Sequence, residues 1–449
     1  MDRDHRLVVC AAGGSAGFLE LPESRVDDER PYISGGERSL YELAVAAASL
    51  GMEVELRGHL NRTILDVLTG SAGAGPHVGL TPRAPDPRDI IVLPEALPRE
   101  LIASAAMSNA RSVMYLLAPP GLMGWSFRPE WAVPDITSVP VDAVGTPAAF
   151  RSISGMGFSL LTNSKGTAEA GRRAGVDVHW IGCGTPVPFP GARDKRFDVA
   201  VVEHNRWSAQ AERVLAALGP VSVKRIPPTP SSYSLSAELA DAGLLIWPSR
   251  LEGGTRVPRE ARAVGTVPVL LGSNPYRNRA EGEVVVDDLE AMAPEIRSLI
   301  GDRDRRERLG NQGIRSAAAE ADWPAFVERV AGVIHSFASA PVPETADTWR
   351  ELADHLRYQV NVERAGYLSR IAALETDIVR LDGGAQELRA TADRMGRELG
   401  ASEAELQALQ SEIQLARDEL AAYRHRFLSR LVDGSVLGPA WRRVKPSRR

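Results

Sequence analysis

The stretch from Leu244 to Gly272 constrains the fold of this chain more than any other, because it reads as strand, loop, helix and strand in succession. The apolar run Leu244 to Trp247 predicts a strand buried in a parallel sheet. A glycine-rich loop follows, and Pro258 suits the first turn of a helix that Gly265 ends. We expect that helix from Val257 to Val264, with a second buried strand directly after it.

The loop of this unit lies where a parallel sheet is expected to bind its ligand. A loop that leaves a strand and enters a helix presents unpaired N–H groups and the positive end of the helix dipole, which favour a phosphate. Glu252 and Glu260 flank the loop, with seven residues between them. Carboxylates repel phosphate, so we expect both to accept hydrogen bonds from sugar or ribose hydroxyls. Arg256 supplies a compensating positive charge.

The spacing of Glu252 and Glu260, with Pro248-Ser249 before it and residues 265–269 (GTVPV) after it, resembles the donor-binding segment of family-four retaining glycosyltransferases. Those enzymes have the GT-B fold and take a sugar from a nucleotide-sugar. The resemblance implies that Glu252 contacts the hydroxyls of the donor sugar and that Glu260 holds the nucleotide ribose. It also places the loop against the donor's sugar and phosphates, through Gly253, Gly254, Thr255 and Val257.

The chain departs from the family at residues 254–256, where Gly-Thr-Arg replaces the common Phe-Gly-Leu. This leaves the identity of the sugar open. The alternative interpretation of the motif is a pair of solvated surface glutamates.

Composition fits a globular protein with an appendage. The 449 residues allow two domains and more, and 44% hydrophobic with 25% charged residues is ordinary. A net charge of −5 argues against nucleic acid as the partner. Cys10 and Cys183 suggest neither a disulfide framework nor a zinc site, so we expect a cytoplasmic protein without metal or cofactor. The apolar run Leu7 to Ala12 is too short for a signal peptide or a membrane span.

The first half of the chain predicts a nucleotide-binding type of domain. Helix Arg38 to Leu50 follows Gly35 and Gly36, which resemble the family's Gly-Gly pair that approaches the donor phosphate or the acceptor. The alternative for this pair is a simple turn before a helix. Buried strands are expected at Leu7–Cys10, Gly51–Leu56, Asp89–Leu93, Ser112–Leu117 and from Phe158, with Ser164 capping the next helix.

Two residues at strand ends are candidates for the acceptor side. Glu95 follows one of these strands and Tyr115 lies near the end of the next, and doubly wound sheets bind ligands there. Their alternatives are a loop glutamate and a core tyrosine.

The second half begins with a predicted strand, Phe197 to Val202, but lacks a feature of the family. There the strand ends in an arginine and a lysine that grip the donor diphosphate, whereas here Arg206 follows and no lysine precedes Lys224. Arg206, Lys224 with Arg225, or Arg256 could take this role; otherwise the site is weakened or lost. Further elements are expected at Ser234–Asp241 (helix), Glu283–Val286 (strand), and Asp288–Ile300, Arg303–Ala319 and Asp322–Phe337 (helices).

Beyond residue 340 the character of the chain changes. Apolar residues occupy one a/d heptad register from Ile371 to Phe427, with Ser402 the only polar break, which predicts a coiled coil and most simply a parallel homodimer. Glycines near Asp382 predict a bend or break. The alternative is one long helix packed on its own domain. The segment Arg424 to Arg449 holds eight Lys or Arg and one Asp among apolar residues, so it suits an anionic membrane surface or is a disordered tail.

Together these features predict an α/β chain of the GT-B fold, with two Rossmann-like domains facing across a cleft and a long helical coiled-coil tail. We expect an acceptor-side domain (1–185), a nucleotide-sugar-binding domain (186–340), a coiled coil (350–430) and a basic tail (431–449). The expected activity is a metal-independent, hexosyltransferase-like transfer with retention, to a glycan or lipid-linked acceptor in cell-surface polysaccharide biosynthesis, at the inner face of the membrane. The alternatives are a catalytically weakened GT-B scaffold and a nucleotide-sugar epimerase.

Overall fold

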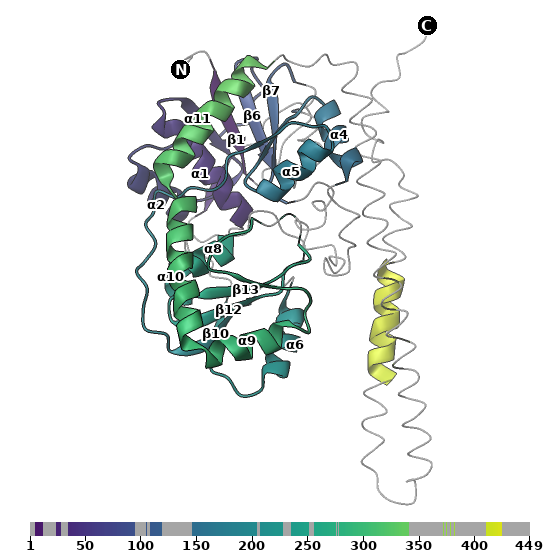
Figure 1. The fold of residues 1–449 in the computed structure, drawn as a ribbon. Helices are drawn as coiled ribbons and strands as arrows, with labels where there is room; N and C mark the ends of the chain where they lie inside the picture. Colours follow the sequence, from purple (N-terminus) through teal and green to yellow (C-terminus); the bar gives the residue numbers. More distant parts are fainter. Residues whose placement is uncertain are drawn as a thin grey trace, which may run out of the picture. The chain divides into compact units, whose positions relative to one another are not determined.

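The first domain is an α/β layer structure built on a parallel sheet (Figure 1). Its seven strands run, in sheet order, β5 (His77–Val78), β3 (Glu53–Arg57), β1 (Arg6–Cys10), β6 (Asp89–Pro94), β7 (Arg111–Leu116), β8 (Ser159–Thr162) and β9 (Val178–Trp180). Its helices are α1 (Gly35–Ser49), α2 (Arg62–Ala72), α4 (Pro147–Gly155) and α5 (Lys165–Arg173), and β2 (Arg25–Asp27) pairs with β4 (His59–Asn61).

The second domain repeats this plan on a smaller sheet. Its five parallel strands run in the order β11 (Val223–Ile226), β10 (Phe197–Val202), β12 (Ala242–Trp247), β13 (Val267–Leu271) and β14 (Val284–Val286). Its helices are α6 (Ser208–Leu218), α7 (Ser236–Leu239), α8 (Arg256–Ala263), α9 (Met292–Gly301) and α10 (Arg303–Glu320).

This description rests on a computed structural model, which describes residues 5–11, 24–27, 35–94, 105, 108–118, 146–203, 207–227, 235–250, 256–274, 276, 278–340, 371, 374, 378, 381 and 410–423.

Helix α11 (Trp323–Ser339) returns the chain from the second domain to the first. Figure 1 shows α10 passing along the second domain and α11 continuing along the first. Phe326, Val330, Ile334 and Phe337 of α11 are buried in the same core as strands β1, β6 and β7 and helix α1. The helix predicted at Asp322–Phe337 therefore packs on the first domain through its apolar face.

Most elements lie within a few residues of their predicted bounds, and four differences concern helix ends. Helix α1 begins at Gly35, so Gly35 and Gly36 are in its first turn and not ahead of it. Helix α8 begins at Arg256, one residue earlier than expected, and α7 is shorter than expected. Helix α9 begins at Met292 because Asp288 accepts a hydrogen bond from the Ala291 N–H, which forms a turn ahead of the helix.

Close contact between α8 and α10 depends on glycine. Gly265 ends α8 with a φ of +72°, a conformation that favours glycine. A Cβ on Gly310 of α10 would lie 2.8 Å from the Gly265 carbonyl oxygen, so only glycine fits there without a shift. The two helices thus approach each other at backbone distance, which fixes the position of α8.

The described tail residues form a compact unit apart from the two sheets. Residues 410–423 are helical, as are the four single positions described before them (Figure 1). Ile371 and Leu374 are buried in one cluster with Leu420 and Tyr423, and Leu381 is buried with Ile413. Residues of the predicted apolar seam therefore pack against one another within one chain. Within the described residues, no helix combines the length and hydropathy that crossing a membrane requires.

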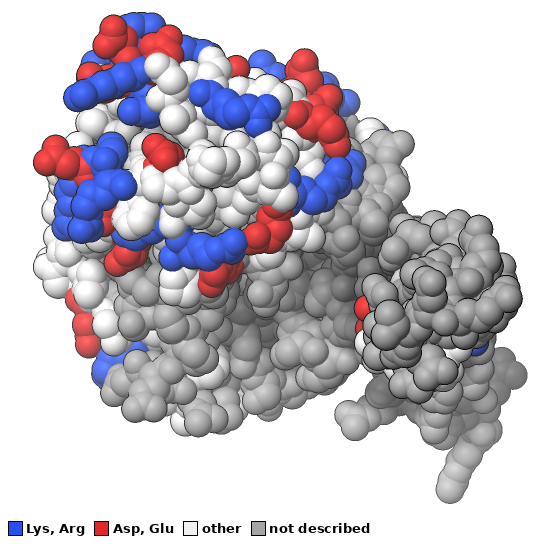
Figure 2. Space-filling model, turned by 90° about the horizontal axis from the view of Figure 1, so that it is seen from below, with Lys and Arg blue, Asp and Glu red and all other residues white. Residues whose placement is uncertain are grey.

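One face of the molecule carries mixed charge. Figure 2 shows Lys or Arg beside Asp or Glu over the coloured residues, and neither sign gathers in one patch there. Among these residues, this face offers no single-sign surface to a polyanion.

Candidate functional site

The predicted site centres on the contact of α8 with α1, which we call the α1–α8 contact and define by Arg38 and Glu42 of α1 with Arg256 and Glu260 of α8. The strand that leads toward it, β12, is buried along its whole length. Among the predicted site residues, Glu252, Gly253, Gly254, Thr255, Arg206 and Glu95 lie outside the described residues.

Arg256 joins the second domain to the first. Its Nη1 and Nη2 donate to Oε2 and Oε1 of Glu42 over 2.6 and 2.7 Å, a bidentate pair between α8 and α1. Both side chains are nearly inaccessible, at 5% and 1% exposure. Burial of this kind makes the pair depend on both partners, because removing one side chain takes two hydrogen bonds and the opposite charge from the other. The guanidinium predicted to face the donor phosphate is thus paired with a carboxylate of the other domain.

Glu260 lies beside this pair. Its Oε2 accepts a hydrogen bond of 2.6 Å from the Leu235 backbone N–H. Its Oε1 lies 3.7 Å from Arg38 Nη1 and 3.8 Å from Arg256 Nε. The carboxylate predicted to hold the ribose is therefore buried and placed where residues of both domains contact it.

Helix α8 carries two further arginines that sequence reasoning did not single out. Arg256, Arg259 and Arg262 are spaced three apart, so they share one face of the helix. Arg262 donates to Glu320 of α10 over 3.0 and 2.8 Å and to Ser316 over 2.8 Å. Their three-residue spacing was the signal that could have revealed them.

Arg259 differs from the other two. It is 3% exposed, and its Nε, Nη1 and Nη2 are all buried without a hydrogen-bond partner. Among the described residues, no other arginine has its whole guanidinium in this state.

The remaining described candidates lie near the same contact. A Cβ on Gly36 would come within 2.9 Å of Leu117 Cδ1, so this glycine lets α1 approach the end of β7. Tyr115 of β7 is fully buried. Burial raises the pKa of Tyr115 well above its ordinary value, with Cys183 and Glu42 adding to the rise and Arg256 and a hydrogen bond from Ser39 opposing it. Val257 is half-buried and packs against the apolar core around β12.

The alternative phosphate-binding cations of the second domain are already paired. Lys224 contacts Glu238 at 2.8 Å and Asp241 at 3.2 Å. Arg225 donates to both carboxylate oxygens of Glu212 over 2.5 and 3.0 Å. In this arrangement neither carries an uncompensated charge for a diphosphate.

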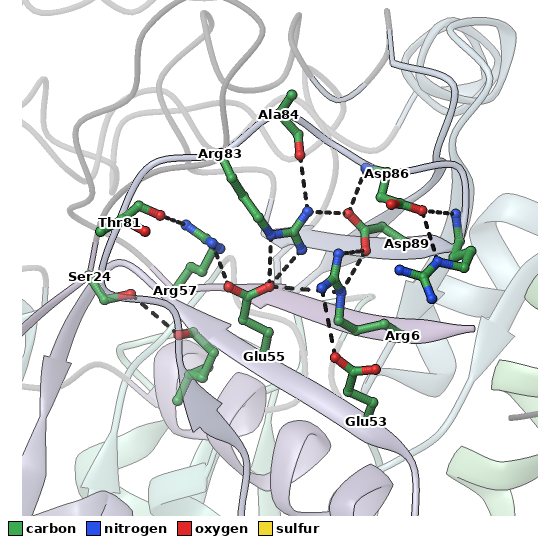
Figure 3. A network of polar contacts seen from close by, with 12 residues as sticks. Arg6, Ser24, Glu53, Glu55, Arg57, Thr81, Arg83, Ala84, Asp86 and Asp89 are labelled. Carbon is green, nitrogen blue, oxygen red and sulfur yellow. Dashed lines mark hydrogen bonds and ion pairs between the residues drawn. The ribbon is translucent and has the colours of Figure 1, made fainter. Parts of the chain in front are cut away.

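A second polar cluster lies in the first domain, on β1, β3 and β6 (Figure 3). Arg83 donates to Glu55 at 2.6 Å and to Asp89 at 2.7 Å, and Arg6 donates to Asp89 at 2.7 Å. Arg57 also donates to Glu55. Burial alone would raise the pKa of Glu55, but hydrogen bonds and charges from Arg83 and Arg57 outweigh it and lower that pKa. Glu53 lies 3.7 Å from Arg6, so three carboxylates balance the three arginines of this cluster, which ties residues 81–89 to the sheet.

No group of His, Cys, Asp or Glu side chains within the described ranges is arranged to hold a metal ion. The buried charges of the α1–α8 contact are compensated by one another, so the arrangement suits hydrogen bonding to a polar ligand.

No protein-family model matches the sequence, and no curated protein matches it. Among solved structures, sucrose-phosphate synthase (tll1590) from Thermosynechococcus elongatus aligns with a TM-score of 0.50 and 14% identity, over 75% of this chain and 100% of that one. Anabaena Alr3699/HepE in complex with UDP aligns with a TM-score of 0.47 and 14% identity, over 74% and 100% of the two chains. A glycosyltransferase from Rickettsia africae ESF-5 aligns at 0.43 and 10% identity, over 75% and 99%.

At such identity the likeness to the synthase shows the fold alone. Together with the two parallel sheets, it confirms the α/β class with two Rossmann-like domains that the sequence predicted.

Proposed function

We propose that the chain is a glycosyltransferase that takes a sugar from a nucleotide-sugar donor. The observation that carries the proposal is Glu260, a buried carboxylate in the helix that follows the glycine loop, where the motif requires a ribose ligand. Its Oε1 lies beside two arginines and, among the described residues, accepts no backbone hydrogen bond, so an incoming hydroxyl would find a fixed acceptor. The two-domain fold supports the same class.

In this proposal Glu252 contacts the sugar and Glu260 contacts the ribose, while loop amides and cations stabilise the leaving diphosphate as charge develops on it. No protein nucleophile is required. Retention of configuration, independence of metal, a hexosyl donor and a glycan or lipid-linked acceptor belong to the same proposal, as do the domain bounds 1–185 and 186–340. They are supported by the resemblance of the motif.

The test is release of nucleoside diphosphate from a panel of nucleotide-sugars. We expect release with at least one donor, and loss of both binding and release in Glu260→Ala. Glu290→Ala is the matched control, because Glu290 is exposed and pairs only with Arg213 at the surface. Release that is unchanged in Glu260→Ala would refute the assignment of this residue.

A second candidate is a GT-B scaffold with weakened activity. One observation favours it: Arg256, Lys224 and Arg225 are all paired with carboxylates. This candidate predicts nucleotide binding by calorimetry without release from any donor. The same assay therefore separates the two candidates.

The tail adds two finer proposals. A homodimer through residues 350–430 would bury the apolar seam, and the basic segment 431–449 would bring the protein to the inner, anionic face of a membrane. Both are supported by the sequence pattern.

A further inference from the structure

Cys183 lies in the segment that follows β9, within electrostatic range of two arginines of α8. Burial raises the pKa of the Cys183 thiol, whereas the charges of Arg259 and Arg256 act to lower it and those of Glu42 and Glu320 to raise it. Two arginines and two carboxylates thus lie within electrostatic range of one thiol.

The two carboxylates are not available to Arg259. Glu42 accepts both hydrogen bonds of Arg256, and Glu320 accepts two from Arg262. Arg329, the other arginine near Cys183, donates to the Ile181 carbonyl at 2.7 Å. Each of these neighbouring charged groups has a hydrogen-bond partner, whereas the guanidinium of Arg259 has none in the described part of the chain.

The guanidinium of Arg259 cannot become neutral by losing a proton, because an arginine side chain remains charged in proteins. A charge left buried and unpaired destabilises the fold, so native structures pair such groups or supply a ligand. Three unpaired N–H-bearing nitrogens in one plane match a phosphoryl group, which offers several acceptor oxygens to the fork. A neutral ligand would leave the charge uncompensated.

We propose that Arg259 is an oxyanion-binding residue whose buried, unpartnered guanidinium takes a phosphoryl group between α8 and the segment of Cys183. The phosphoryl group comes from the donor diphosphate or from free inorganic phosphate. In the first case the inference rests on the proposed function, and Arg259 supplies the cation that the end of β10 was expected to provide.

The first experiment measures thermal unfolding of the full chain in inorganic phosphate and in sodium chloride of equal ionic strength. We expect phosphate to raise the melting temperature of the wild type, and Arg259→Met to weaken the apparent phosphate affinity by about tenfold or more, because hydrogen bonds to charged groups are lost. Without phosphate, Arg259→Met should melt higher than the wild type, because the uncompensated charge is gone. Arg213→Met, an exposed arginine of α6, is the matched control and should respond like the wild type.

Arg259→Lys keeps a point charge without the fork and should bind phosphate with intermediate affinity. If Arg259→Met does not fold, Arg259→Lys replaces it in the comparison with the wild type. A wild type without a phosphate-specific shift, or variants at Arg259 that respond as the wild type does, would overturn the inference.

A second arm separates the sources of the phosphoryl group. UDP, GDP and ADP are each compared with their nucleosides by calorimetry. If Arg259→Met weakens a diphosphate but not its nucleoside, the group belongs to the donor; if it weakens inorganic phosphate alone, the site is a separate anion site. Donor turnover without phosphate binding at Arg259 refutes this inference alone, whereas phosphate binding without turnover of any donor refutes the proposed function alone.

Discussion

Substitutions that remove the charge of Arg256, of Glu42 or of both should show that the two side chains stabilise the two-domain body as an ion pair. Glu42→Gln keeps the shape of the side chain but leaves the Arg256 guanidinium buried without its carboxylate. Removal of one partner of a buried pair costs about 3–5 kcal/mol, so we expect a loss of that order in the free energy of unfolding. Arg256→Met removes the two hydrogen bonds and the positive charge that Arg256 gives to Glu42, and it should cost a similar amount.

The double variant, Glu42→Gln with Arg256→Met, tests whether the two charges act as a pair. With both charges gone neither is left uncompensated, so its loss should fall short of the sum of the single losses by at least about 2 kcal/mol. The free energies come from urea unfolding of the full chain. The exposed pair Arg213–Glu290, at 3.1 Å, is the control, and its cycle should give about 0.2–1 kcal/mol. A coupling at the α1–α8 contact no larger than that of the control would refute the argument.

Three further outcomes are expected. Glu260→Ala should abolish nucleotide-sugar binding in calorimetry, because it removes the buried ribose acceptor; unchanged affinity would contradict this. Arg256→Lys should lower donor turnover less than Arg256→Ala, because a point charge remains when the fork is lost, and full activity in Arg256→Ala would argue against a role in phosphate binding. The chain should lose stability as the pH falls below 4.5. The pKa of Glu55 is lower in the folded chain than in the unfolded chain, so the ionised carboxylate stabilises the fold, and this contribution is lost as Glu55 is protonated. Urea unfolding at pH 7 and pH 3 should show a smaller difference in Glu55→Gln than in the wild type, and equal differences would exclude this carboxylate as a cause.

The order of elements in the second domain could be predicted from the sequence because local signals agree there. An apolar run bounded by Pro248 predicted β12, and Gly265 predicted the end of α8, which the structure places two residues before it. By contrast, α2 was not predicted, although Asn61 caps it and Ile64, Leu65 and Leu68 form its buried face. Its buried residues all fall within positions 64–68, which is too short a run for a periodicity argument.

The partners of the site residues could not be predicted. Arg256 and Glu42 are 214 residues apart in sequence, and nothing local to either specifies the other. Sequence reasoning assigned Arg256 to an external phosphate and could not show the carboxylate of Glu42 that it also contacts in the folded chain. Arg259 was passed over for the related reason that a lack of partners is a property of the folded chain and has no sequence pattern.

The packing partners of the apolar seam in the tail could not be predicted from the sequence either. A heptad register specifies which residues must be buried but not which residues bury them. In a parallel dimer the residues of one layer would face their own copies, so Ile371 would meet Ile371 of a second chain. In the structure Ile371 and Leu374 instead pack with Leu420 and Tyr423, while Leu381 packs with Ile413. From Ile371 to Leu381 the sequence runs forward, while the residues they contact run backward from Tyr423 to Ile413. This is the order of contacts in an antiparallel pair of helices. Light scattering of the full chain at micromolar concentration separates this pairing from the proposed homodimer. A dimeric mass that is lost on truncation after residue 340 would support the homodimer, whereas a monomeric mass would show that the seam is buried within one chain.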